Sequence, residues 1–178
     1  MTTSLASHDI AEMIRGATSE VFQTMLNLSL ESLPSHEEPD LPEPFDGVVS
    51  MVGIGGTWIG TGRISSPPEL ACKLAEAMLL TPCSAINAEV LDASAEIANM
   101  IIGNVKTMLE EKLGPLALSV PTVIFGRNYR THCSGMDNWT VVPFRTEGMK
   151  MDISFCLKPA RSAVYSHANH RLETVHSF

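Results

Sequence analysis

The segment Asn87–Gly114, with the sequence NAEVLDASAEIANMIIGNVKTMLEEKLG, decides the fold of this chain. It starts with an asparagine, a favourable N-cap residue, and it ends at Gly114-Pro115, a typical helix terminator. On a helical wheel its apolar residues fall within one half. These are Ile97, Ala98, Ile101, Ile102, Val105, Met108, Leu109 and Leu113. We therefore predict one long helix, running from near Asn87 to Leu113, whose apolar half faces the core.

The other half of this helix is largely polar. Glu96 and Asn99 are i,i+3 neighbours, so a carboxylate and a carboxamide can reach the same external point. Gly103 lies on the next turn, where a glycine costs the helix roughly 1 kcal/mol relative to alanine and suits a close approach by another molecule. Met100 adds an adaptable apolar side chain that suits a protein contact. A merely solvated polar face is the alternative interpretation of the same spacing.

Upstream, apolar residues recur at helical spacing from His8 to about Leu30 and predict a first amphipathic helix. The stretch 32–46 then holds four prolines among acidic residues. Proline removes a backbone donor and breaks helices, so this stretch can neither continue the helix nor pair centrally in a sheet. We interpret it as an acidic connector.

Two β-type runs, 48–54 and 57–64, meet across Gly55-Gly56 and predict a tight hairpin. The prolines at 67 and 68 then open a helix that extends to about Leu80. Its apolar residues again recur at helical spacing.

After the long helix, residues 118–125 are expected to form a strand, and 139–145 with 149–157 a hairpin that turns at Glu147-Gly148. These elements predict an α/β fold of two layers, in which an antiparallel sheet is covered on one face by the two long helices. Residues 1–158 are expected to form a single domain that includes the connector, and 159–178 a polar C-terminal tail.

Composition excludes several classes of function. The chain has 178 residues, of which 44% are hydrophobic, and a net charge of −8. Such a chain can fill a core, but it offers no broad cationic face for nucleic acid or anionic lipid. No segment has the apolar length of a membrane span, and the N-terminus does not resemble a signal peptide. We expect a cytoplasmic protein that binds neither nucleic acid nor membrane.

The cysteines and histidines do not predict a metal site. The four cysteines are far apart and lack a Cys-x-x-Cys pair, so we interpret them as reduced core thiols. They are Cys72, Cys83, Cys133 and Cys156. His167, His170 and His176 lie in the polar tail, where a solvated role is the simpler interpretation.

The pattern Asp92-x3-Glu96-x2-Asn99, continued directly by Met100-Ile101-Ile102-Gly103-Asn104 and later by Pro121, resembles the active-site helix of the CheC/CheX/FliY family of chemotaxis phosphatases. Within that family the resemblance is greatest to CheX. It extends over most of the chain, from the first helix to Ser119-Val120-Pro121, and leaves out the first residues and the tail.

The resemblance implies hydrolysis of the aspartyl phosphate on a CheY-like response-regulator receiver domain. Glu96 would form an ion pair with the receiver's active-site lysine, and Asn99 would orient the attacking water. Asp92 would orient Glu96 or have no role. Phosphoryl transfer needs mainly positioning and charge stabilisation, and the receiver brings its own Mg²⁺, so this chain need bind no metal or cofactor.

Members of this family are pseudo-twofold repeats, and the first helix aligns with the long helix when Glu20 is set against Glu96. Gln23 then replaces Asn99, and Gly16 replaces Asp92. The longer side chain would displace a bound water, so we expect a degraded first-half site and one working site. The resemblance further implies a homodimer. The rival interpretation is a non-catalytic adaptor that binds receiver or flagellar-switch proteins.

Overall fold

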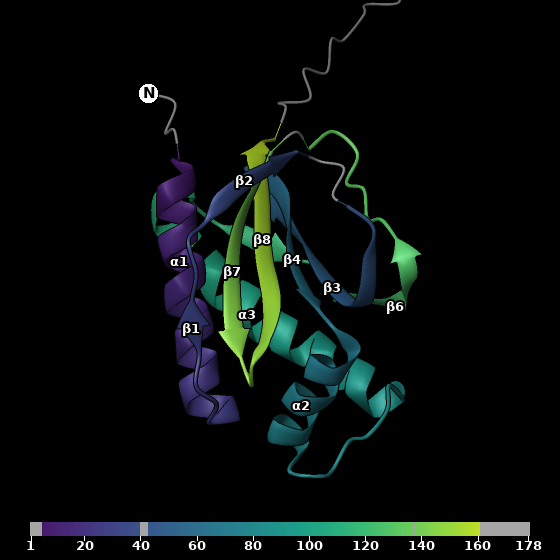
Figure 1. The fold of residues 1–178 in the computed structure, drawn as a ribbon. Coiled ribbons are helices and arrows are strands. Elements are labelled where there is room, and N and C mark those ends of the chain that lie inside the picture. The colour runs from purple at the N-terminus through teal and green to yellow at the C-terminus, as the bar shows by residue number, and fades with distance from the viewer. Residues whose placement is uncertain (1–4, 40–42, 137, 161–178) are drawn as a thin grey trace, which may run out of the picture.

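The computed structural model, which describes residues 5–39, 43–136 and 138–160, packs helices against one antiparallel sheet (Figure 1). The helical elements are α1 (Ser7–Val21), the π-helical turn η1 (Phe22–Leu26), α2 (Pro68–Leu79) and α3 (Ala88–Leu113). The strands are β1 (Glu31–Ser32), β2 (His36–Pro39), β3 (Phe45–Gly56), β4 (Trp58–Ser66), β5 (Leu116–Leu118), β6 (Thr122–Tyr129), β7 (Asn138–Thr146) and β8 (Met149–Pro159). The predicted α/β class is confirmed.

Within the described residues the sheet has eight strands, six of which follow the order β1-β7-β8-β4-β3-β5. Strand β2 also pairs with β7, and β6 also pairs with β3, so short or irregular strands stand at both ends. Helix α3 crosses behind the sheet in Figure 1, and α1 stands beside it near β7. The prediction that the two long helices pack on one face of the sheet is confirmed.

Helix α3 forms as its sequence predicts. The side chain of Asn87 accepts a hydrogen bond from the backbone N–H of Val90 at 2.9 Å, which caps the first turn. Gly114 ends the helix at φ +79°, a conformation that favours glycine, and its N–H donates to the carbonyl of Glu110. The apolar half is buried, apart from Met108, which is half-buried.

The close approach of α3 to the sheet depends on Gly62 of β4. A Cβ atom at Gly62 would lie 2.8 Å from Cγ1 of Ile102 and within 3.0 Å of two further atoms of that side chain. Ile102 is fully buried in the main core, which also contains Ile64 and Phe155 from the sheet and Phe22 from the first helix. The glycine therefore sets how near the helix lies to the strands.

The predicted hairpins differ in outcome. Strands β7 and β8 turn at Glu147-Gly148 as expected, and both turn residues have positive φ, as a type I′ turn requires. The hairpin predicted over residues 48–64 forms, because β3 and β4 pair antiparallel, but its turn is wider than expected, since this pairing ends at Ile54 and Gly60. Gly55 and Gly56 instead continue β3 and pair with β5. The sequence pattern did not reveal this second partner.

The single strand predicted over 118–125 is also wrong. It is divided into β5 and β6, which pair with different parts of β3. At the break, the hydroxyl of Ser119 accepts from the N–H of Gly53 at 2.8 Å, and the Ser119 N–H donates to the Gly53 carbonyl. Pro121 follows, and because it lacks an N–H it cannot continue the ladder.

The first helix and the connector are close to expectation. The α-helical part ends at Val21 and continues as the π-turn to Leu26, so the predicted end near Leu30 is too late. The last two residues of the predicted connector, Phe45 and Asp46, already belong to the internal strand β3, so its predicted end is too late. The rest of the connector, where it is described, contributes β2 and the second residue of β1, which pair with the outer side of β7. Prolines tolerate such edge positions.

All four cysteines lie in the described part of the chain, where they are thiols and form no disulfide with one another. Cys72 and Cys156 are buried, as expected of core thiols, whereas Cys83 and Cys133 are half-buried and lie at the margins of smaller apolar clusters. The tail histidines 167, 170 and 176 lie outside the described residues.

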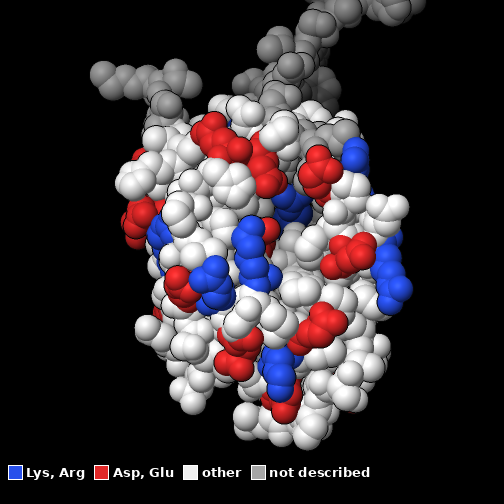
Figure 2. Space-filling model, in the orientation of Figure 1, with Lys and Arg blue, Asp and Glu red and all other residues white. Residues whose placement is uncertain are grey.

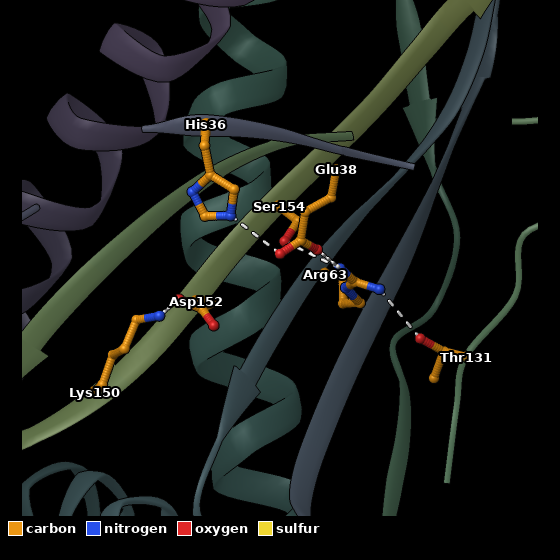
Figure 3. A network of polar contacts seen from close by, with 7 residues as sticks. All are labelled: His36, Glu38, Arg63, Thr131, Lys150, Asp152 and Ser154. Carbon is orange, nitrogen blue, oxygen red and sulfur yellow. Dashed lines mark hydrogen bonds and ion pairs between the residues drawn. The ribbon is translucent and has the colours of Figure 1, made fainter. Parts of the chain in front are cut away.

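The face of the sheet opposite the helices carries a polar network centred on Arg63 (Figure 3). Because Gly62 and Ile64 face the helices, Arg63 between them faces the other side. Its guanidinium lies 3.7 Å from the carboxylate of Glu38 and 4.5 Å from the ring centroid of Trp139. It also donates to Thr131 at 3.3 Å and to Ser154 at 3.4 Å.

Burial lowers the pKa of Arg63, and the attraction of Glu38 is the largest effect in the opposite direction. Glu38 belongs to β2, so this ion pair holds the edge strand over the sheet. Figure 2, in the orientation of Figure 1, shows acidic and basic side chains intermixed over the visible face, without an extended area of one sign. The network therefore has a structural role, because it links the edge strand β2 to the inner strand β4.

The Gly62 contact predicts that Gly62→Ala destabilises the fold by about 1–3 kcal/mol, because the new methyl group overpacks against Ile102. Urea unfolding measures the change. Gly16→Ala is the matched control, since a Cβ atom at Gly16 would have no atom within 4 Å and alanine favours helix α1. Combining Gly62→Ala with Ile102→Ala should cost less than the sum of the two single variants. Strict additivity would contradict the contact.

The Arg63 network predicts unequal effects of two carboxylate removals. Glu38→Ala should lower the free energy of unfolding by about 1–3 kcal/mol, because the guanidinium left behind is only 7% exposed. The control, Glu31→Ala, removes a shorter 2.8 Å pair with Arg145 whose partners are 59% and 52% exposed. Such pairs contribute about 0.2–1 kcal/mol. If Glu31→Ala lowers the free energy of unfolding as much as Glu38→Ala or more, the N–O distance, and not the burial of the pair, determines its contribution to stability.

Candidate active site

The predicted site residues of α3 lie on its outward face. Glu96 is exposed and Asn99 is half-buried, one turn apart on the same stripe. The neighbouring residues Ile97 and Ala98 are buried in the core. The burial of these two residues fixes the rotation of the helix, so the carboxylate and the carboxamide are both directed away from the sheet.

The side chains of Glu96 and Asn99 have no polar partner among the described residues, since neither makes a hydrogen bond or an ion pair there. By contrast, other polar residues of α3 are occupied: Glu110 pairs with Lys106 at 2.7 Å, and Thr107 donates to the carbonyl of Gly103 at 3.1 Å. The two predicted residues are therefore available to a molecule outside the chain.

Asp92 lies one turn before Glu96 and is exposed. Two carboxylates four residues apart repel each other, and neither can donate a hydrogen bond when ionised. Asp92 therefore does not orient Glu96 by direct bonding. Both line an open groove of about 460 Å³ between the end of α2 and the start of α3, with Met78 and Leu79 on the α2 side.

Gly103 and Met100 complete the predicted stripe. A Cβ at Gly103 would meet only the Leu118 side chain at 3.9 Å, so space remains above the helix at this point. Met100 is half-buried and packs against the main core. Only the outer part of the Met100 side chain is open to contact.

Glu20 and Gln23, the residues of the predicted degraded site, have different surroundings from Glu96 and Asn99. Glu20 is exposed near the end of α1, and its carboxylate accepts a hydrogen bond from Asn104 of α3 at 3.3 Å. Gln23 lies in the π-helical turn η1, where the i,i+3 alignment of an α-helix is lost. Glu20 and Gln23 therefore lie in two different helical elements, whereas Glu96 and Asn99 both lie within α3.

No group of three potential metal ligands occurs among the residues that the structure describes. No helix in the same part of the chain is long and apolar enough to span a membrane. The Arg63 network lies on the other face of the sheet from α3.

The chain matches the family model described as chemotaxis phosphatase CheX over residues 48–145. Comparison with curated protein sequences gives no match. Among solved structures, the chain is 25% identical to a chemotaxis protein CheX from Desulfovibrio desulfuricans, with a TM-score of 0.74. That match covers 84% of this chain and 99% of the other.

Two further structures share the fold. The chain is 24% identical to the CheX structure in a complex with CheY, BeF3 and Mg²⁺ from Borrelia burgdorferi, with a TM-score of 0.69 and coverage of 84% and 98%. It is 17% identical to FliY from Thermotoga maritima, with a TM-score of 0.59 and coverage of 90% and 93%.

The family match and the CheX structure define the class as a chemotaxis phosphatase. Within that class, the chain belongs to the CheX family, whose model covers more than half of its residues.

Sequence reasoning missed the groove beside Glu96. Its apolar side comes from the end of α2, where Met78-Leu79-Leu80 continues apolar residues past the helix end. Three consecutive large apolar residues just before Pro82 were the available signal. Their meaning depended on the packing of α2 against α3, which the pattern of α2 alone does not give.

Proposed function

We propose that this phosphatase hydrolyses the aspartyl phosphate of a CheY-like receiver domain through Glu96 and Asn99 of α3. The observation that carries the proposal is the outward stripe on which both side chains are free of intramolecular partners within the described residues. Membership of the CheX family supports the reaction class. The CheX of Borrelia burgdorferi, crystallised with CheY, supports the kind of partner.

Asn99 would position the attacking water. Its carboxamide offers both a donor and an acceptor, and it adds no negative charge beside an anionic phosphoryl group. Water attacks phosphorus in line with the bond to the aspartyl oxygen, that bond breaks, and the receiver regains its carboxylate while inorganic phosphate leaves. Positioning of this kind is the main protein contribution to phosphoryl transfer.

Glu96 would bind the active-site lysine of the receiver. An ion pair that becomes buried in a complex fixes the docking geometry and is worth more than an exposed pair. The Mg²⁺ ion belongs to the receiver substrate, as the composition of the Borrelia burgdorferi complex suggests. We assign no metal to this chain.

One working site per chain is part of the proposal. The hydrogen bond of Glu20 to Asn104 and the π-helical position of Gln23 both support a degraded first half. We also propose that residues 1–158 act as one domain and that the reaction takes place in the cytoplasm, where a chemotaxis receiver would be met.

We propose a homodimer formed through the β6 edge of the sheet. Strand β6 pairs with β3 on one side, and its Ile124 and Phe125 side chains are exposed. Val120, just before the strand, is 83% exposed. An apolar, unprotected edge strand invites pairing with another chain, and a second copy would cover it.

Asn99→Ala should reduce kcat about 100-fold or more, because the variant folds normally but no longer positions water. Glu96→Ala should weaken receiver binding as well as turnover, since it removes the partner of the receiver's lysine. Phosphate release, followed over a range of phosphorylated receiver concentrations, separates kcat from KM.

Gln23→Ala is the control for these variants and should change both constants by no more than about twofold, as surface substitutions usually do. Wild-type turnover by Asn99→Ala would disprove the site, and a strong Gln23→Ala defect would show that the first half is active. If the wild-type chain binds the phosphorylated receiver but leaves its decay unchanged, the chain acts as an adaptor.

Light scattering at micromolar concentration should give twice the 19.3 kDa chain mass. Ile124→Lys should shift the mass to that of one chain, because charge on the proposed edge opposes pairing. Met25→Lys, at a residue 53% exposed on η1, is the control and should leave the dimer intact. A monomeric wild-type mass would remove the dimer from the proposal.

A further inference from the structure

The groove beside Glu96 is built from two kinds of residue. Met78 and Leu79 come from the end of α2, and Leu79 is 41% exposed although it lies on a helix that packs into the core. Ala93 of α3 is buried and forms part of the apolar lining. The lining thus offers an apolar surface that no described part of the chain covers.

The opposite rim is acidic. Glu89, Asp92 and Glu96 follow one another along one stripe of α3, and no lysine or arginine of the described chain lines the groove. All three side chains are exposed. The rim repels acidic surfaces and favours a partner that presents lysine or arginine beside an apolar side chain.

Leu80 gives an independent indication of a partner. It ends α2 in the left-handed conformation, at φ 55° and ψ 32°, where a glycine is normally preferred. It is also 89% exposed and lies between Leu79 and Thr81, two residues that line the groove. A leucine at this position strains the backbone and exposes apolar surface, and neither effect stabilises the isolated chain.

We infer that the groove and Leu80 form the docking surface for the receiver, and that they bind a segment with an exposed apolar side chain flanked by lysine or arginine. This inference rests on the proposed function, because it assigns the receiver as the occupant. Glu96 belongs both to the groove and to the candidate active site, so docking here brings the acyl phosphate toward Asn99. Leu80 contacts the partner and takes no part in the chemistry.

Leu80→Gly tests the inference, because it removes the contact while relieving the backbone. The variant should keep or raise its thermal midpoint, and it should bind the receiver about tenfold more weakly, as expected for an interface side chain that becomes buried. The probe is the CheY-like receiver whose acyl phosphate the wild-type chain hydrolyses, loaded with BeF3⁻ and Mg²⁺. At saturating phosphorylated receiver, kcat should stay near the wild-type value.

Asn27→Gly is the matched control. Asn27 also ends a helical element in the left-handed conformation, at φ 52°, but it follows η1 and does not line the groove. Its substitution likewise places glycine at a left-handed helix end, although asparagine tolerates this conformation better than leucine, and it should leave binding unchanged. Binding by Leu80→Gly within about twofold of wild type would overturn the docking surface.

The acidic rim has a separate test. Glu89→Gln should slow association with the same receiver at low ionic strength, and added salt should reduce the difference, because rim charges mainly steer encounter. Glu111→Gln, also exposed on α3 but away from the groove, is the control. If Glu89→Gln and Glu111→Gln slow association equally, the acidic rim does not steer the receiver.

The outcomes distinguish the inference from the proposed function. If wild type hydrolyses the receiver phosphate and Leu80→Gly binds normally, only the docking surface fails. If wild type binds the BeF3⁻-loaded form of a CheY-like receiver without accelerating its dephosphorylation, and Leu80→Gly weakens that binding, the docking surface stands and catalysis fails. If wild type binds no CheY-like receiver, both fail.

Discussion

The contact between Ile102 of α3 and Gly62 of β4 is the constraint on which the rest of the structure depends. Because the strand has no side chain at this point, the helix lies close to the sheet and its apolar half is fully used in packing. Little freedom of rotation then remains to α3. The outward direction of Glu96 and Asn99 is therefore a consequence of core packing.

The charged groups on the two sides of the sheet differ in their surroundings. Arg63 is buried, and its neighbours compensate it with a carboxylate, two hydroxyls and an aromatic ring. Glu96, on the helical side, is exposed and has no partner within the described residues. A compensated buried charge holds an edge strand in place, whereas an uncompensated exposed charge remains able to bind another molecule.

The sequence predicted what local patterns determine. The α3 bounds followed from Asn87 and Gly114, and the β7 to β8 turn from Glu147-Gly148, because caps and turns depend on a few adjacent residues. The division of residues 118–125 and the pairing of Gly55 and Gly56 could not be predicted, since both depend on the second partner of β3. The placement of Glu96 followed from periodicity, whereas the groove required the packing of α2 against α3.

This packing separates two demands on α3. The proposed reaction needs only Glu96 and Asn99 on a rigid stripe, but recognition of a protein substrate needs an area larger than one helix turn. Helix α2 supplies that area, because its last residues lie beside Glu96 and remain exposed. The strained Leu80 is understandable in these terms, since a glycine there would favour the helix end but offer nothing to bind. In the proposed docking surface, Leu80 thus makes the end of α2 less stable but provides apolar surface for the receiver close to Glu96.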